Sequence, residues 1–329
     1  MARPDGPLAV ITGGAGFVGS NLARLLVAGG WTVRVLDDLS IGSSAYLRGV
    51  THDLVLGSLR DAGLVRRTLA DADAVVHLAA RAGIPDSIAD PITTFDANVT
   101  QTVGLLDAAR TAGVRRFVFA SSNAVIGDHE PPSSETSLPH PTSPYGASKL
   151  AGEAYVEAYA AAYAIPGVVL RFSNVYGPHS LHKKSVVATW IRAALDGRPL
   201  TVHGDGRQTR DFVHVADLVS GIVAALTAPE EAVSGQLFQI GTGVETPVID
   251  VADAIRACVG HDIRVVHGPE RAGDVRRSVA RIDRAIDVLG YRPGIGVAEG
   301  IASTADWFGA ARVDPELAAI VPDARSGSD

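Results

Sequence analysis

The feature that most constrains the fold of this chain is a regular alternation of short β-branched runs and longer helical patterns over its first half. Strands are predicted in "LAVIT" (8–12), "TVRVLD" (32–37), "AVVHLAA" (74–80) and "RRFVFASS" (115–122). Helices are predicted from about residue 18, near 62–69, over 93–113 and from near Tyr145. Strands that alternate with helices form right-handed βαβ units. The sequence therefore predicts an α/β fold built on a doubly wound parallel sheet.

The pattern changes after about residue 172, where loops rich in Gly and Pro separate shorter strands and helices. We expect a nucleotide-binding domain over 1–172, a smaller C-terminal substrate-binding α/β region over 173–211 and 245–315, and a tail over 316–329 whose end is disordered. The run "GQLFQIGTG" (235–243) is apolar enough to join the main sheet. The segment 212–244 is therefore predicted to return to the first domain.

Composition excludes several classes of protein. The net charge of −7 argues against a general affinity for nucleic acid or anionic membranes. Apolar runs stay well below the roughly 18 residues that a membrane span needs, and the N-terminus lacks the pattern of a signal peptide. We expect a cytoplasmic protein. The single cysteine, Cys258, permits no internal disulfide and is expected in the core.

A glycine-rich turn follows the first strand in "TGGAGFVGSNLARLL", with Gly13, Gly16 and Gly19 at the turn and the start of a helix. Glycines let the backbone approach a pyrophosphate, and free amides at a helix N-terminus favour its charge. The second strand then ends at Asp37. A carboxylate there can accept both hydroxyls of a ribose and repels a 2′-phosphate. The sequence predicts a Rossmann-type domain that binds NAD rather than NADP.

Tyr145 and Lys149 lie four positions apart at the start of a predicted helix, so their side chains share one face. A nearby ammonium favours the phenolate, and a tyrosine with a lowered pKa can act as a general acid or base near neutral pH. Two further segments, "HLAA" (77–80) and "SSNAVIG" (121–127), lie at the carboxyl ends of predicted strands. They end at the edge of the sheet where open α/β folds bind ligands.

Together these motifs resemble the extended short-chain dehydrogenase/reductase family, specifically its nucleotide-sugar epimerases and dehydratases. The resemblance extends through "RFSNVYGP" (171–178), "GDGRQTRDFVHVADL" (204–218) and "ERAGDVRRS" (270–278). It implies that Tyr145 is the catalytic acid and base, that Lys149 positions it and the nicotinamide ribose, and that Ser122 holds the sugar oxygen. A fainter likeness is to the UDP-glucuronate 4-epimerases of moenomycin-type antibiotic pathways.

The same resemblance implies two sets of binding residues. Besides Tyr145 and Lys149, the cofactor set is Gly13, Gly16, Phe17, Val18, Asp37, Asp38, Ser40, Gly42, Ser58, Leu59, Leu78, Ala79, Ala80 and Asn98. The substrate set is Ser122, Asn123, Tyr145, Asn174, Val187, Arg192, Thr201, Val202, His203, Arg210, Arg271 and Asp274. Guanidinium groups such as Arg210 and Arg271 suit a pyrophosphate. The resemblance also implies a homodimer formed by the helix that opens near Tyr145 and the one near 98–110.

The residues directly after Ser122 predict the reaction. Dehydratases and decarboxylases that resemble this chain carry an acid there, whereas this chain has Asn123 and Ala124. Without that acid, a 4-keto sugar can turn over and be reduced on its other face, which is 4-epimerisation of a UDP-sugar. A basic cluster that includes Lys183, Lys184 and Arg192 favours UDP-glucuronate, with UDP-galacturonate as the product.

Alternatives stay open. The chain can instead be a UDP-glucose/UDP-galactose 4-epimerase, or a dehydratase or decarboxylase that uses another acid. A non-catalytic NAD-binding regulator is a third interpretation, which the retention of Tyr145, Lys149 and Ser122 disfavours. Solvated surface is the simplest interpretation of Lys183, Lys184 and Arg192 taken singly. No metal site is expected, because His179 and His182 form the only close histidine pair and lack acidic or thiol neighbours.

Overall fold

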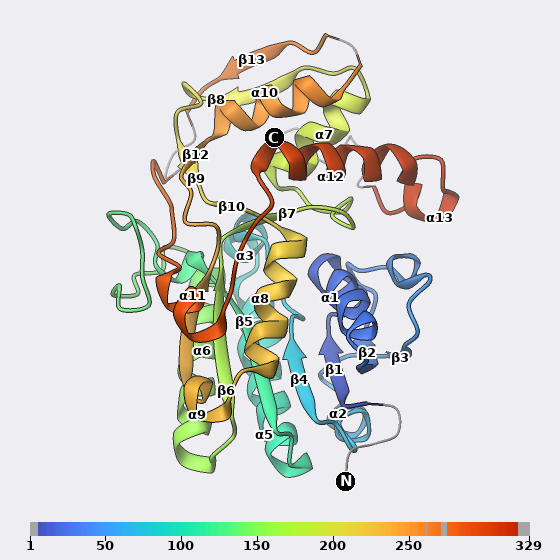
Figure 1. Cartoon of the computed structure of the whole chain (residues 1–329), viewed down its shortest axis with the longest axis vertical. Coiled ribbons are helices and arrows are strands. Elements are labelled where there is room, and N and C mark those ends of the chain that lie inside the picture. The colour runs from blue at the N-terminus through green and yellow to red at the C-terminus, as the bar shows by residue number, and fades with distance from the viewer. Residues whose placement is uncertain (1–5, 261, 271–274, 322–329) are drawn as a thin grey trace.

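A seven-stranded parallel sheet lies at the centre of the larger part of the molecule (Figure 1). The computed structural model describes residues 6–260, 262–270 and 275–321. The strand order is β11-β6-β5-β4-β1-β2-β3, and every neighbouring pair is parallel. The strands are β1 (Leu8–Thr12), β2 (Thr32–Asp37), β3 (Asp53–Leu56), β4 (Ala74–His77), β5 (Arg116–Ser122), β6 (Gly167–Phe172) and β11 (Gln236–Ile240). The predicted α/β fold with a doubly wound parallel sheet is confirmed.

Helices cover both faces of this sheet, because successive strand side chains point to opposite sides. Ile11 of β1 belongs to one buried cluster, which α1 (Phe17–Ala28) and α8 (Val215–Thr227) complete. Its neighbour Val10 belongs to the opposite cluster, beneath α2 (Ala62–Thr68), α5 (Gln101–Ala112) and α6 (Pro144–Tyr163). The continuous apolar strands of the sequence are therefore buried on both sides. None of the helices in the described ranges is long and apolar enough to cross a membrane.

The smaller part has a hydrophobic cluster of its own and lies beyond the carboxyl ends of the central strands (Figure 1). Its helices are α7 (Val186–Leu195), α10 (Val248–Cys258), α12 (Val297–Ala311) and α13 (Pro315–Ala318). Its paired strands are β7 (Asn174–Tyr176) with β10 (Phe212–His214), β8 (Leu200–His203) with β13 (Val265–Gly268), and β9 (Thr209–Arg210) with β12 (Thr246–Pro247). The short remaining elements are η1 (Ser44–Leu47), α3 (Ile84–Ala89), α4 (Pro91–Phe95), η2 (Asp96–Thr100), η3 (Asn123–Val125), α9 (Glu230–Val233) and α11 (Asp283–Leu289).

Two segments along the central sheet bear on the sequence predictions. The run 236–240 joins the sheet as β11 beside β6, as its apolar character predicted. The single helix predicted over 93–113 is instead α4, the π-helical turn η2 and α5 in succession. The exact boundaries of the two predicted domains stay a prediction, and 322–329 of the tail lie outside the described residues.

Cys258 is exposed, so the expectation that it belongs to the core was wrong. It is the last residue of α10, whose core positions are Val248, Val251, Ala252 and Ile255. The spacing of three and four residues between these core positions places the next one at 258 or 259, where the helix ends. The Cys258 thiol donates to the carbonyl of Ala254 at 3.1 Å. Partial burial raises the pKa of this thiol, which disfavours the reactive thiolate.

The glycine turn sets how closely α1 packs against β1. A Cβ atom at Gly19 would lie 2.4 Å from the carbonyl oxygen of Gly13 and 2.5 Å from the Cα of Gly14. These neighbours are backbone atoms and cannot move away as a side chain can. The third glycine is therefore required for helix packing, whereas Gly13, with φ of 69°, is required for the turn itself.

We expect Gly19→Ala to lower the free energy of unfolding by about 1–3 kcal/mol, because the added methyl group forces α1 away from the turn. Urea denaturation followed by circular dichroism measures this change. Gly309→Ala is the matched control: it lies in α12 with no atom within 4 Å of the new Cβ. That control should be stabilised by about 0.5–1 kcal/mol. Equal effects of the two substitutions would contradict the packing argument.

Candidate active site

Asp37 joins the glycine turn to the end of β2. One carboxylate oxygen, Oδ2, accepts from the backbone N–H of Ala15 at 3.0 Å, and Oδ1 accepts from Leu39 at 2.8 Å. Asp37 is buried, and burial raises the pKa of its carboxyl group, while the two backbone donors oppose that shift. Each oxygen keeps a further lone pair, so this carboxylate can still accept hydroxyl groups. It is fixed in place beside the glycine turn.

The loop after Asp37 is held over the same turn. A Cβ atom at Gly42 would lie 2.6 Å from the carbonyl oxygen of Ala15, so only glycine fits at this approach. Asp38 is exposed and accepts from the Ser40 amide and hydroxyl at 3.0 and 2.6 Å. The predicted cofactor residues Asp37, Asp38, Ser40 and Gly42 thus form one short segment beside Ala15.

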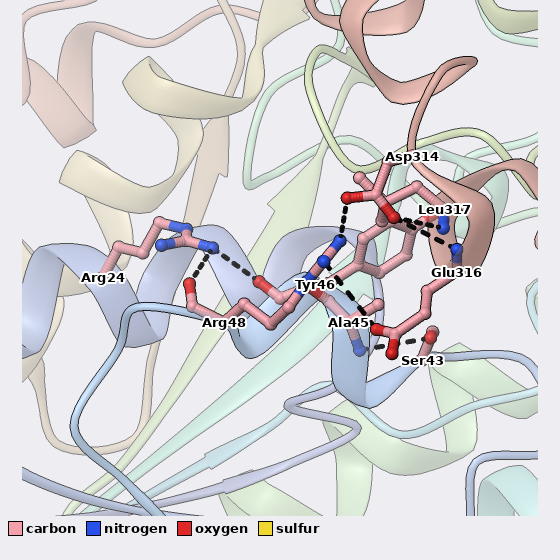
Figure 2. Close-up of polar contacts among 8 residues, drawn as sticks. All are labelled: Arg24, Ser43, Ala45, Tyr46, Arg48, Asp314, Glu316 and Leu317. Atoms are coloured by element: carbon pink, nitrogen blue, oxygen red, sulfur yellow. Dashed lines mark hydrogen bonds and ion pairs between the residues drawn. The ribbon is translucent and has the colours of Figure 1, made fainter.

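The far end of that loop is anchored to the C-terminal part of the chain (Figure 2). Arg24 of α1 donates to the carbonyls of Tyr46 and Arg48 at 2.7 and 3.0 Å. Arg48 donates to Asp314 at 2.6 Å, and the other oxygen of Asp314 caps α13. Helix α13 therefore fixes the position of η1 and, through it, of the loop over the glycine turn.

The segment Leu78–Ala80 faces Gly13 from the end of β4. A Cβ atom at Gly13 would lie 2.8 Å from the Ala79 amide nitrogen, so the two backbones touch. Ser58 and Leu59 follow β3, which lies beyond β2 on the side of β1 opposite to β4, and both are half-buried. Phe17 differs from these residues, because its side chain is in the hydrophobic core and only its backbone is available to a ligand.

Tyr145 and Ser122 meet at the end of β5, where the Ser122 hydroxyl acts to lower the pKa of the Tyr145 phenol. The pKa of Tyr145 is raised, because burial outweighs this effect of Ser122. The spacing argument, in which Lys149 lowers this pKa, is therefore wrong for the chain by itself. The Lys149 ammonium instead donates to the carbonyl of Ala120 at 2.8 Å. Desolvation of the phenol dominates, and a lowered pKa would need a further positive charge at the site.

Asn98 links the π-helical turn η2 to the helix that carries Tyr145. Its side-chain oxygen accepts from the backbone N–H of Arg81 at 2.8 Å. Its side-chain nitrogen donates to the carbonyl of Arg81 at 3.1 Å and to the Ser148 hydroxyl at 2.9 Å. Ser148 in turn donates to the carbonyl of Tyr145 at 2.7 Å. Asn98 is fully buried, so its side chain positions the segment after Leu78–Ala80 and the first turn of α6 together.

His77 continues this polar network into the sheet. It is fully buried between the hydroxyls of Thr12 and Thr102, at 2.7 and 2.8 Å, and Thr102 donates to the carbonyl of Asn98. Burial and the charge of Lys149 lower the pKa of His77 to about 3. The ring is therefore neutral and connects the first strand to η2.

The residues predicted for the nucleotide are spread over the smaller part. Asn174 and Thr201 are exposed, and His203 is half-buried. Val187 and Val202 belong to the core of the smaller part, so only their backbones can contact a ligand. Arg210 donates to the carbonyls of Thr209 and Val275, and Arg271 and Asp274 lie outside the described residues. The structure therefore brings the residues predicted for catalysis and for the dinucleotide together more completely than those predicted for the nucleotide sugar.

Asn123 follows Ser122 and is an amide in a mostly buried position. Its Nδ2 donates to the Ser173 hydroxyl at 3.1 Å, and its Oδ1 has no partner in the described part of the chain. It lines a small cavity with Ile126, His129 and Arg277. An amide at this place can accept or donate a hydrogen bond, but it cannot transfer a proton.

The three cations of the basic cluster have different surroundings. Arg192 donates to the carbonyls of Leu181 and Lys183 at 2.6 and 2.9 Å, so its guanidinium holds the loop before α7. Lys184 is exposed, while Lys183 is half-buried. Burial lowers the pKa of Lys183, and within the described residues no carboxylate pairs with it. Arg192 therefore has a structural role, and Lys183 is the cation available to a ligand.

Sequence reasoning missed two buried carboxylates near the site. Glu153 lies one turn after Lys149, and the same four-residue spacing that singled out Lys149 would have found it. Asp211 follows Arg210 and is fully buried, with its oxygens accepting from Ser173, Thr242, Gly243 and Ala280. The sequence did contain a signal for Asp211, which is an acid inside the largely apolar run "RDFVHV". Because unpaired charges are rarely buried, an acid in such a run indicates that fixed donors surround it.

Comparisons with known proteins agree with this geometry. Residues 9–241 match the model of the NAD dependent epimerase/dehydratase family. The UDP-glucose 4-epimerase of Mycolicibacterium smegmatis is 39% identical over 309 residues, which cover 91% of this chain and 97% of that protein.

Two solved structures resemble this chain over more than nine tenths of its length. The dTDP-glucose 4,6-dehydratase DesIV of Streptomyces venezuelae, with NAD and TYD bound, has a TM-score of 0.86 and 34% identity and covers 94% of this chain and 99% of its own. The UDP-glucuronic acid 4-epimerase of Bacillus cereus, with UDP-glucuronic acid and NAD bound, has a TM-score of 0.85 and 28% identity and covers 92% and 99%. The glycine turn, its close approach to Ala79 and the fixed carboxylate of Asp37 fit the cofactor of these neighbours.

We expect Asp37→Asn to weaken NAD binding by roughly 10- to 100-fold, because hydrogen bonds to a charged acceptor are lost. Binding of NADP should weaken less, since the carboxylate no longer repels a 2′-phosphate. Titration calorimetry with both dinucleotides measures the two changes. Asp53→Asn, an exposed acid at the start of β3 and away from the carboxyl ends of the strands, is the control and should alter neither affinity. An unchanged NAD affinity in Asp37→Asn would remove the ribose-binding role of this residue.

Proposed function

The chain belongs to the NAD dependent epimerase/dehydratase family, and from that premise we propose that it catalyses the 4-epimerisation of a UDP-sugar. One observation carries this proposal: Ser122 lies at the end of β5 close enough to the Tyr145 phenol to lower its pKa, and the next residue is an amide rather than an acid. The first part supplies proton transfer at a sugar hydroxyl. Because Asn123 is an amide, the site lacks at this position the acid that elimination of water would need.

NAD is the cofactor of this family, and neighbouring structures contain it. The residues proposed to hold it are the glycine turn, the segment from Asp37 to Gly42, Leu78–Ala80, Ser58, Leu59, Asn98, Tyr145 and Lys149. When bound, NAD supplies a hydride acceptor for carbon 4 of the sugar. Its positive nicotinamide ring also supplies the further charge that the Tyr145 phenol lacks in the chain by itself.

The proposed work of the protein is proton transfer and orientation. Tyr145 takes the proton of the sugar 4-hydroxyl and returns it to the same oxygen after the 4-keto sugar has turned over and carbon 4 has been reduced on its other face. Ser122 holds that oxygen by its hydroxyl. The Lys149 ammonium is buried and donates to the carbonyl of Ala120, directly before the two serines at the end of β5. Its proposed role is to hold positive charge at this end of the sheet. The same three side chains act in both directions, so the 4-keto sugar is transient.

Epimerisation is favoured over dehydration or decarboxylation by the surroundings of Asn123. Neither Asn123 nor Ala124 can accept or donate the proton that the loss of water requires. Asn123 is also engaged by the Ser173 hydroxyl, which fixes its amide. A 4-keto sugar held here has one course open to it, which is to turn over and be reduced.

UDP-glucuronate is the substrate that we propose, with UDP-galacturonate as the product. Lys183 supports a carboxylate, because this half-buried ammonium has no acidic partner among the described residues and an anion would offset the cost of its burial. The relative named UDP-glucose 4-epimerase supports the second candidate, interconversion of UDP-glucose and UDP-galactose. The likeness to moenomycin-type glucuronate epimerases and a cytoplasmic location stay predictions.

A homodimer is also proposed, through the outer surface of α3, α4 and α6. Ile88, Ile92, Phe95 and Tyr155 are all more than 40% exposed there, and α6 contacts both α3 and α4. Exposed apolar side chains gathered on adjoining helices mark an interface between proteins. Light scattering that finds only a monomer at micromolar concentration would reject this assembly.

We expect the purified protein to convert UDP-glucuronate to UDP-galacturonate, and Tyr145→Phe to lose about 10²- to 10⁴-fold in turnover while keeping its NAD, because only proton transfer is removed. Proton NMR of the products and the absorbance of bound dinucleotide measure both. A pentose or a 4-keto-6-deoxy sugar as product would refute epimerisation. Turnover that survives in Tyr145→Phe would refute the acid and base role.

Lys183→Met should raise KM for UDP-glucuronate by roughly tenfold or more and leave KM for UDP-glucose unchanged, because the charge is lost and the stem is kept. Lys184→Met is the matched control at the exposed neighbour and should change neither constant. Steady-state kinetics with the two sugars separates these outcomes. If both constants rise equally in Lys183→Met, the lysine does not read the carboxylate.

A further inference from the structure

The groups in direct contact with the buried Lys149 ammonium are neutral. It is 4% exposed, its ammonium donates to the carbonyl of Ala120 at 2.8 Å, and it lies 4.9 Å from the centre of the Phe119 ring. A carbonyl and an aromatic face carry only partial charges. Burial therefore favours the neutral amine, which could no longer assist the Tyr145 phenol.

One turn further along α6, Glu153 supplies a full negative charge in the same buried layer. It is 2% exposed, and Arg171 of β6 binds it with two hydrogen bonds of 2.8 and 2.6 Å. The Ser121 hydroxyl donates to the same carboxylate. Three donors from two neighbouring strands thus fix the orientation of Glu153, and Ser121 directly precedes the catalytic Ser122.

Other charged groups packed around α6 are accounted for. Burial holds His77 neutral, with a pKa of about 3. The remaining charged groups on α6 and on the elements packed against it are Asp86 of α3, Asp96 of η2, Asp107 and Arg110 of α5, Arg116 of β5, and Glu157 of α6 itself. Asp96 pairs with Arg60, Asp107 pairs with Arg110, and Arg116 donates to two carbonyls at the C-terminal end of α8. Asp86 and Glu157 are exposed, and the charges of Glu153 and Arg171 both act on Glu157. Glu153 is the acid whose charge favours the protonated form of Lys149.

We propose that Glu153 is a positioning residue of the reaction: its carboxylate, locked by Arg171 and Ser121, keeps the buried Lys149 protonated beside Tyr145. This inference rests on the proposed acid and base role of Tyr145. Burial lowers the pKa of Lys149 to about 8, and Glu153 opposes that shift. Lys149 therefore lies close to losing its proton at the upper end of the physiological range, so loss of the opposing charge should be measurable.

The test uses a convenient property of the chain, which has only three lysines, Lys149, Lys183 and Lys184. In the NAD-bound protein labelled with carbon-13 at the lysine ε position, three resonances report three titrations, and Lys149→Arg assigns the first. We expect the Lys149 titration to move to lower pH by roughly one unit or more in Glu153→Gln. Asp107→Asn, on the neighbouring helix α5 where this exposed acid pairs with Arg110, is the control and should leave it in place.

Glu153→Gln leaves Arg171 as an unpaired buried cation, which by itself can destabilise the fold. The double variant Glu153→Gln/Arg171→Met removes both charges and keeps two side chains of similar size, so we expect it to fold. The Lys149 titration should move to lower pH in this variant too. An unchanged titration in the double variant, or its failure to fold, would overturn the proposal and leave the pair a purely structural role.

Kinetics provide the second readout. The alkaline limb of kcat/KM should shift to lower pH in the double variant by the same amount as the Lys149 resonance, with activity near pH 6 retained in large part. A uniform loss of activity at every pH, with the limb in place, would indicate structural damage and contradict the proposal. The lysine titration does not depend on turnover, so it can fail or succeed independently of the Tyr145→Phe test.

Discussion

The parallel arrangement of the seven central strands is the constraint on which the site depends. Because every strand runs in the same direction, Gly13, Asp37, Leu78 and Ser122 all lie at strand ends along one edge of the sheet. The smaller part lies beyond that edge (Figure 1). Residues separated by more than 100 positions thus come together without long loops, and each side chain is held by an element whose core is buried on both faces.

The chemistry proposed at this edge needs charges in surroundings that disfavour them. Burial raises the pKa of Tyr145 and lowers that of Lys149, so both shifts oppose an active phenolate and ammonium pair. The protein counters with fixed polar partners: Ser122 for the phenol, and Glu153, held by Arg171, for the ammonium. A buried ion pair of this kind adds little to stability by itself. Its proposed role is electrostatic: the Glu153 carboxylate favours the protonated form of Lys149.

The substrate side shows a division between structural and available polar groups. Arg192 is fully used by loop carbonyls, and Asn123 is partly used by Ser173. Lys183 has no such partner among the described residues, which leaves it as the group that an anionic sugar would meet. In the proposed function, the choice between a uronate and a neutral hexose would depend on the loop before α7 that carries Lys183. The residues proposed for proton transfer lie at the end of β5 and on α6, away from that loop, which suits relatives that share a fold and differ in substrate.

The sequence by itself determined the α/β fold, the glycine turn after the first strand and the placement of Tyr145 and Lys149 on one helix, because strand periodicity, glycine spacing and helical spacing are local properties. It also found the strand over 236–240 that returns to the sheet. Only the tertiary structure decided that Lys149 does not lower the pKa of Tyr145 in the chain alone, that Arg192 holds a loop, that Cys258 is exposed, and that Glu153 lies in the layer of Lys149. Those outcomes depend on burial and on partners from distant strands, and neither quantity is encoded in the spacing of neighbouring residues.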